Sequence, residues 1–224
     1  MREFSFNDLL FILAATQWTI VLSILAFTLG GIVGLVLAVL RISKFTPVRL
    51  AAAGYIQLFQ GTPLLMQLFL VYYGLGLFGL RLDAWTAVTI VYTAYAAAFL
   101  SDIWRGCIQA VPKEQWEASR ALALGYLLQL WLVILPQAVR IAIPPTVGFM
   151  VSLVKATAVA SIIGFVELTR AGQLMTNATF QPMIVYPIVA GLYFALCRPL
   201  SIWSRHLEKR LRVDNAFGVK TGGV

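Results

Sequence analysis

Residues 17–40 read QWTIVLSILAFTLGGIVGLVLAVL and carry no charged side chain. A helix needs about 20 mostly apolar residues to cross the hydrocarbon core of a bilayer, because its backbone polar groups must hydrogen-bond within their own segment. The stretch therefore predicts a membrane-spanning helix. Within it, Gly30 and Gly34 have the GxxxG spacing, which predicts close packing against another helix rather than contact with a ligand.

Four further stretches have the length and apolar character of spans. They lie at 55–79, 85–104, 131–154 and 181–203. The stretch 131–154 is the least regular, because Arg140, Pro136, Pro144 and Pro145 are expected to interrupt it. Over the whole chain 60% of residues are hydrophobic and 12% are charged, whereas soluble domains carry roughly 25% charged residues. The sequence thus predicts an all-α integral membrane fold with about five transmembrane helices.

Charged residues outside the spans predict the orientation of the chain, because cytoplasmic loops of membrane proteins collect Lys and Arg. One side of the membrane carries Arg41, Lys44, Arg49, Arg105, Lys113, Arg120, Arg205, Lys209, Arg210, Arg212 and Lys220. The other side carries only Arg2, Arg81, Lys155 and Arg170. We therefore expect a periplasmic segment at 1–16, a transmembrane domain at 17–204 and a basic cytoplasmic tail at 205–224 in a multi-pass protein of the bacterial inner membrane. This placement of the net charge of +8 favours the lipid bilayer, and not nucleic acid, as its partner.

The chain lacks the residues for several kinds of catalytic site. Its single histidine, His206, lies in the basic tail, so neither a His-based metal site nor a Ser-His-Asp triad can be assembled. The two cysteines, Cys107 and Cys197, lack metal-ligand spacing and are expected to be packing residues. No Gly-Lys-Ser/Thr sequence occurs, so the phosphate-binding loop of an ATPase is missing. We expect no catalytic residue, cofactor or metal in this chain, and any ATP must be handled by another subunit.

The stretch 111–126, VPKEQWEASRALALGY, is a polar segment between two predicted spans on the expected cytoplasmic side. Pro112 stands at a plausible first position of a helix. One helical face combines small and apolar residues, namely Ala118, Ala121, Leu122 and Gly125. A different face carries the charged residues Lys113, Glu117 and Arg120. A charged face is compatible with simple solvation, whereas the small residues favour docking into a groove of another protein.

Glu117-Ala118-Ser119, followed by Ile134-Leu135-Pro136, resembles the EAA loop of ABC importer permeases. The family pattern is Glu-Ala-Ala, three residues, Gly, about nine residues, and Ile-x-Leu-Pro. Here Ser119 replaces the second Ala, Ala123 stands at the Gly position with Gly125 nearby, and Val133 stands at the Ile position. By this resemblance, the residues that couple to an ATPase are Glu117, Ala118, Ser119, Arg120, Ala123 and Gly125. Glu117 is the expected charged contact, and an intrahelical pair with Lys113 or Arg120 is the alternative.

Three further segments resemble the permeases of polar amino acid importers, which include the glutamine, histidine and arginine systems. They are Phe59-Gln60-Gly61-Thr62-Pro63, Ser101-Asp102-Ile103-Trp104-Arg105-Gly106, and Lys155-Ala156-Thr157-Ala158-Val159 with Glu167-Leu168 downstream. The resemblance implies a type I importer permease that forms half of a translocation path with a second permease chain, identical or related. It also implies a dimer of cytoplasmic ATPase subunits, which bind ATP and Mg²⁺, and a periplasmic amino-acid-binding protein.

Ionisable residues near the span ends are candidate substrate contacts, because a free amino acid carries an ammonium and a carboxylate. Asp102 would offer an anion, since such residues in spans usually face an interior cavity, although it could also be a simple interfacial residue. Lys155 could meet a carboxylate or snorkel to the surface, and Thr157 and Glu167 could line the same vestibule. Gln60 is a further candidate, although it replaces the Arg usual in the family, and Ala156 replaces an Asp. The amino acid itself is left open.

Two other classes of function are weighed against the importer permease. A self-sufficient secondary transporter or channel would need its own coupling machinery, usually inverted repeats with broken helices, and no convincing internal repeat is visible. A membrane scaffold or receptor has no reason to combine the polar segment 111–126 with ionisable residues at span ends. A neighbouring pair of genes for a P-loop ATPase and a secreted solute-binding protein would separate these alternatives.

Overall fold

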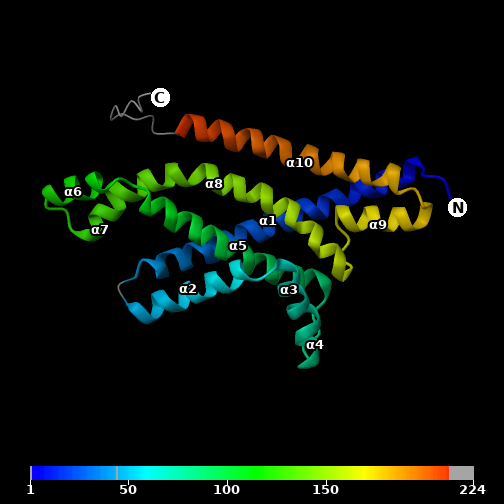
Figure 1. The fold of residues 1–224 in the computed structure, drawn as a ribbon, viewed down its shortest axis with the longest axis horizontal. Coiled ribbons are helices and arrows are strands. Elements are labelled where there is room, and N and C mark those ends of the chain that lie inside the picture. Colours follow the sequence, from blue (N-terminus) through cyan, green and yellow to red (C-terminus); the bar gives the residue numbers. More distant parts are fainter. Residues whose placement is uncertain (1, 44, 212–224) are drawn as a thin grey trace, which may run out of the picture.

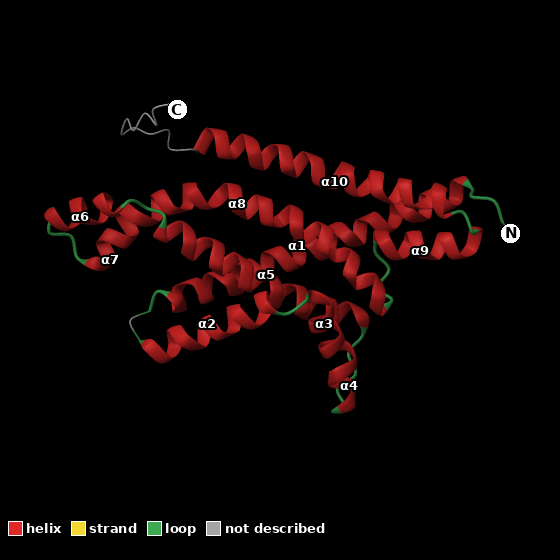
Figure 2. Cartoon of the chain, viewed as in Figure 1, coloured by secondary structure: helices red, strands yellow, loops and turns green. Residues whose placement is uncertain are grey.

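The computed structural model describes residues 2–43 and 45–211, and every regular element in these ranges is helical (Figures 1 and 2). The α-helices are α1 (Phe6–Arg41), α2 (Thr46–Gly61), α3 (Leu64–Phe69), α4 (Leu75–Leu77), α5 (Ala84–Gln109), α6 (Lys113–Ala121), α7 (Tyr126–Leu128), α8 (Leu135–Ala156), α9 (Leu168–Thr179) and α10 (Pro182–Leu211). Two π-helical segments, η1 (Leu70–Gly74) and η2 (Gln129–Ile134), and one 3-10 segment, η3 (Thr157–Ile163), connect some of them.

The described helices confirm the all-α membrane fold with about five spans. Four are long and apolar enough to cross a membrane by themselves, and they are α1, α5, the continuous run Tyr126–Ile163, and α10. The fifth is a bent pair, in which α2 and the segment Leu64–Leu77 meet at 104°. In Figure 1 the segment from α3 to α4 projects away from the other helices.

This bend corrects the predicted span 55–79, which begins earlier than expected and is broken. The helix starts at Thr46 and ends at Gly61. Proline disfavours helical geometry in the preceding residue, and Thr62, just before Pro63, is extended with φ −117° and ψ 142°. The amide of Gln67 donates to the carbonyls of Phe59 and Thr62 at 2.9 and 3.0 Å, so acceptors at the break are satisfied.

The expected interruption of the span 131–154 is also corrected. The backbone stays helical from Tyr126 to Ile163, with Pro144 and Pro145 inside α8. Prolines are tolerated in spanning helices where a neighbour satisfies the freed backbone groups. The Ser204 hydroxyl of α10 donates to the Pro144 carbonyl at 3.0 Å, which links α10 to α8 beside the two prolines.

Both ends of the chain are more helical than expected. The first helix begins at Phe6, inside the segment 1–16, because Ser5 and Asp8 form a capping box and Asp8 also pairs with Arg2. The last helix, α10, continues to Leu211 and so includes the start of the predicted tail. Residues 212–224 of that tail lie outside the described residues.

The centre of the bundle is the crossing of α1 and α5. A side chain at Gly30 would place its Cβ 2.5 Å from the Cβ of Ala96, and at Gly34 it would lie 3.0 Å from the carbonyl oxygen of Ala97. The predicted close packing at these two glycines is therefore confirmed. Tyr92 continues this core and donates a hydrogen bond to the carbonyl of Ala156 at 2.8 Å, which ties α5 to α8.

Candidate functional site

The polar helix α6 lies at one end of the bundle, between α5 and α7, at the end opposite to the described N-terminus and α9 (Figure 1). One of its faces is packed on the following segment. The ring of Trp116 stacks on Tyr126 with centroids 6.2 Å apart, and the amide of Gln137 in α8 donates to the Gln115 side chain at 3.2 Å. Ser119 is 2% exposed and donates to the carbonyl of Trp116 at 2.9 Å. The Trp116–Tyr126 and Gln115–Gln137 contacts fix α6 to the start of the fourth span.

The remaining faces of α6 are open. Glu117, Ala118, Arg120 and Ala121 are exposed, and so is the capping residue Leu122. The ion pairs among the described residues are Arg2–Asp8 and Arg105–Asp102, so the alternative pairing of Glu117 with Lys113 or Arg120 is not formed. Ser119 differs from its expected place on this surface, because it faces inward. The exposed set Glu117, Ala118, Arg120, Ala121 and Leu122 is called the docking surface below.

A sharp turn follows α6 at the position where the family pattern has glycine. Ala123 has φ +56°, in the left-handed region, and its N–H donates to the carbonyl of Arg120 at 2.8 Å. Gly125 has φ −66° and adopts an ordinary extended conformation. The turn is therefore kept at Ala123, and Gly125 does not substitute for the family glycine.

Replacing Ala123 with glycine should stabilise the protein by about 1 kcal/mol, because an L-residue with a Cβ pays roughly that cost in the left-handed region. The matched control is Ala118→Gly, in the interior of α6, which should destabilise by up to about 1 kcal/mol because glycine is a poor helix former. The measurement is the thermal midpoint of the purified protein in detergent. Shifts of the same sign in both variants would contradict this account of the turn.

The candidate substrate contacts do not converge on one place. Asp102 pairs with Arg105 of the same helix, with 2.7 Å between carboxylate and guanidinium. Asp102 lies at about the same level along the bundle as Trp104, whose indole N–H donates to the Thr146 hydroxyl at 3.0 Å. Lys155 adjoins Ala156, which lies at the level of Tyr92. Tyr92 and Asp102 are ten residues apart in α5, which is about 15 Å along the helix axis.

Of the other candidates, Gln60 and Lys155 are exposed, whereas Thr157 is fully buried. The Gln60 side chain lies in the last turn of α2, just before the bend. The Thr157 hydroxyl donates to the carbonyl of Val154 at 2.7 Å. In this conformation Thr157 is thus packed inside the bundle and does not line an open vestibule.

Glu167 is also fully buried, lies outside the spanning helices, and connects α9 to two of them, α1 and α10. Its carboxylate caps α9 by accepting the N–H groups of Thr169 and Arg170 at 2.9 and 2.8 Å. It further accepts the Tyr193 hydroxyl of α10 at 2.8 Å and faces the Thr19 hydroxyl of α1 at 3.5 Å. Burial raises the pKa of the Glu167 carboxyl, and these donors partly oppose that shift. Sequence reasoning missed Thr19 and Tyr193, because neither lies near Glu167 in the chain.

The fold and α6 define a class of multi-pass membrane protein with a short exposed helix at one end of the bundle. The family of the binding-protein-dependent transport system inner membrane component matches residues 30–213. The chain therefore belongs to this family of ABC transporter permeases, and it is a multi-pass membrane protein of that kind.

Relatives in sequence and structure agree with this assignment over most of their length. The L-cystine transport system permease protein TcyB of Bacillus subtilis is 37% identical, covering 87% of this chain and 83% of TcyB. The Probable amino-acid ABC transporter permease protein YckA of the same organism is 32% identical, covering 93% and 95%. A crystal structure of an amino acid ABC transporter with histidines matches with a TM-score of 0.88 at 32% identity, covering 93% of this chain and 100% of that one. The MetNI methionine transporter shares the fold, with a TM-score of 0.76 at 16% identity.

Proposed function

We propose that this chain is the membrane-spanning subunit of an ATP-driven importer of polar amino acids, and that α6 is its contact with a cytoplasmic ATPase. The observation that carries the proposal is the docking surface, which is exposed on a helix whose other face is fixed to the span Tyr126–Ile163. The relatives support the substrate class, because their names specify amino acids, L-cystine and glutamine.

The contacts of α6 suggest how a movement of the bound ATPase is transmitted to the spanning helices. Trp116 and Gln115 hold the helix against α7 and α8, so α6 and the fourth span can move as one body. A dimer of ATPase subunits binds ATP and Mg²⁺ and closes, and this chain contributes no residue to that reaction. Rigid movement of the span then opens the path, formed with a second permease chain, to the other side of the membrane.

The orientation follows from the same assignment. The end of the bundle with α6 is cytoplasmic, and the end with α9 faces the periplasm and receives substrate from a binding protein. Lys155 is the proposed contact for a substrate carboxylate, because it is exposed and belongs to no ion pair among the described residues. Gln60 and Asp102 are proposed as further polar contacts along the path, and Thr157 and Glu167 can reach substrate only after the bundle rearranges.

Charge reversal at the docking surface tests the proposal. Glu117→Lys should lower ATP-dependent amino acid uptake about tenfold or more, because reversing one partner of an interface charge pair costs 2 kcal/mol or above. The measurement is uptake into proteoliposomes that contain the permease and its ATPase and are supplied with the amino-acid-binding protein, together with the amount of ATPase that co-purifies. The matched control is Glu208→Lys, an exposed glutamate of α10 with the same change in charge, which should transport normally.

Normal uptake by Glu117→Lys would remove the coupling role of α6. Full uptake by the wild-type chain without any ATPase would favour the self-sufficient transporter instead. Loss of uptake in both variants would mean that net charge, and not the α6 contact, determines the effect.

A further inference from the structure

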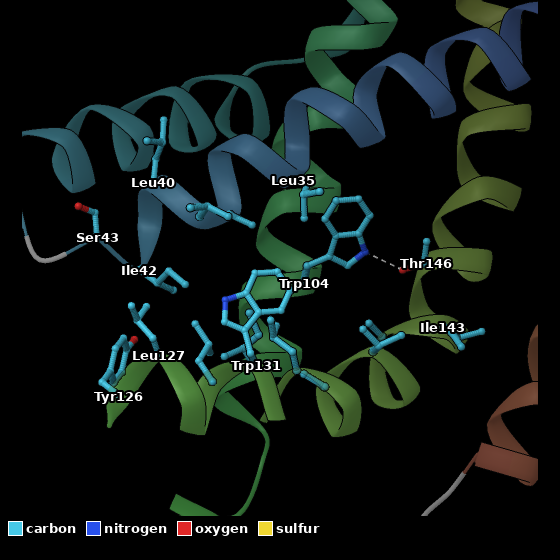
Figure 3. A pocket seen from close by; sticks show the side chains of 18 of the residues that line it. Leu35, Leu40, Ile42, Ser43, Trp104, Tyr126, Leu127, Trp131, Ile143 and Thr146 are labelled. Atoms are coloured by element: carbon cyan, nitrogen blue, oxygen red, sulfur yellow. Dashed lines mark hydrogen bonds between the residues drawn. The ribbon is translucent and has the colours of Figure 1, made fainter. Parts of the chain in front are cut away.

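A large groove lies between α1 and the run from α7 to α8, in the half of the bundle that carries α6 (Figure 3). Its volume is about 1450 Å³. Leu35 and Val39 of α1 form one wall, and Trp131, Val139 and Ile143 form the other. Trp104 of α5 lies at its floor, and its indole N–H is already bonded to Thr146.

The lining of this groove is suited to hydrocarbon and not to an amino acid. None of the residues that line it is Asp, Glu, Lys or Arg. None of its side-chain donors or acceptors is among the buried polar atoms that lack a partner in the described chain. A zwitterionic solute would lose its hydration here without gaining compensating partners. The occupant must therefore be apolar over most of its length.

We propose that the groove binds the acyl chains of an anionic phospholipid from the leaflet at the α6 end. Its end near Ser43 and Tyr126 adjoins the last turn of α1, where Arg41 lies between the lining residues Leu40 and Ile42. Arg41 has a buried Nε without a hydrogen-bond partner and belongs to no ion pair among the described residues. A guanidinium forms strong charge-assisted bonds with phosphate.

A second cation supports an anionic headgroup in preference to a neutral one. Arg140 follows the lining residue Val139 in α8, is exposed, and likewise belongs to no described ion pair. Basic residues beside grooves between spanning helices on the cytoplasmic side attract anionic headgroups. Two unpaired arginines beside an uncharged apolar groove thus match an anionic amphiphile. The orientation of the leaflet rests on the proposed function, whereas the binding itself does not.

The test quantifies lipid that stays bound after purification in mild detergent from vesicles containing equal amounts of phosphatidylglycerol and phosphatidylethanolamine. The wild-type chain should retain phosphatidylglycerol preferentially. Val139→Trp fills the groove from an exposed wall position and should lose the retained lipid. The matched control is Val36→Trp, because Val36 is similarly exposed on α1 but does not line the groove, and it should retain lipid as the wild type does.

Arg41→Gln should keep the retained lipid but lower the preference for phosphatidylglycerol roughly fivefold, since one arginine near an anionic headgroup contributes about that factor. Equal retention in Val139→Trp and wild type, or no preference between the two lipids in the wild type, would overturn the proposal. So would disulfide cross-linking of Val139→Cys between two chains in a Cys107→Ala/Cys197→Ala background, because a second copy would then cover the groove. Each result can arise with uptake intact, so failure here is distinct from failure of the proposed function.

Discussion

Replacing Gly30 with alanine should force α1 and α5 apart and destabilise the protein by about 1–3 kcal/mol, the usual cost of overpacking a tight core. The added Cβ would lie 2.5 Å from the Cβ of Ala96 and 3.0 Å from the carbonyl oxygen of Thr93. Both partners belong to the opposite helix and cannot rotate away. Gly30→Val adds two more methyl groups at the same point, and we expect little folded protein.

The matched control is Gly31→Ala, one residue along the same helix. A Cβ there would lie 3.8 Å from Trp104 and 3.9 Å from Leu100, which is ordinary contact. This variant should therefore be as stable as the wild type or slightly more stable, because alanine favours a helix. The measurement is the fraction of extracted protein that remains monodisperse in detergent after heating. Equal loss of monodisperse protein in the two variants would contradict this account, because the close contact with α5 exists only at Gly30 and not at Gly31.

The second large effect is expected at the buried carboxylate. Glu167→Ala leaves the N–H groups of Thr169 and Arg170 without an acceptor and leaves the Tyr193 hydroxyl only the Thr169 hydroxyl, at 2.9 Å. Each unsatisfied buried donor costs about 1–3 kcal/mol, and for the two N–H groups this cost is the same loss as that of the helix cap. The two N–H groups together give at least about 2 kcal/mol, which is a large part of the stability of a typical domain.

Tyr193→Phe is the comparison, because it removes one donor and leaves the carboxylate and the cap of α9 in place. It should cost about 1 kcal/mol, the net contribution of a single hydrogen bond. Expression level and thermal midpoint in detergent measure both variants. If Glu167→Ala proves as stable as Tyr193→Phe, the carboxylate does not hold α1, α9 and α10 together, and a role on the solute path becomes the better explanation.

Features set by neighbouring residues could be predicted from the sequence. The glycine spacing at Gly30 and Gly34 predicts a close helix contact, and hydrophobic length predicts about five spans. The docking surface is also visible, since Glu117 and Ala118 belong to a local polar helix. Helical periodicity could not determine which face of α6 packs on the bundle. Ser119 lies on the packed face and is buried, although it follows two exposed residues.

Features that depend on distant partners could not be predicted. Proline has opposite outcomes at two places, because Thr62-Pro63 breaks a helix whereas Pro144-Pro145 remains inside one. Ser204 of α10 bonds to the carbonyl of Pro144, a contact between distant segments that no local pattern reveals. Glu167 is similar, since its partners Thr19 and Tyr193 lie on α1 and α10. An acidic residue near the end of a span predicts exposure on the solute path. Only the three-dimensional packing shows that Glu167 is instead buried and caps α9.

The π-helical segment η2 joins the short helix α7, which follows α6 and its turn, to the first turn of α8. A π-helical turn holds one residue more than an α-helical turn, and each residue of an α-helix advances the side-chain direction by about 100°. The direction in which Glu117 points around the axis of α8 therefore depends on one additional residue in η2. Conversion of Gln129–Ile134 into ordinary α-helix without removal of that residue would rotate α6 by about a quarter turn around the axis of α8, whereas deletion of the extra residue would keep α6 in its present direction.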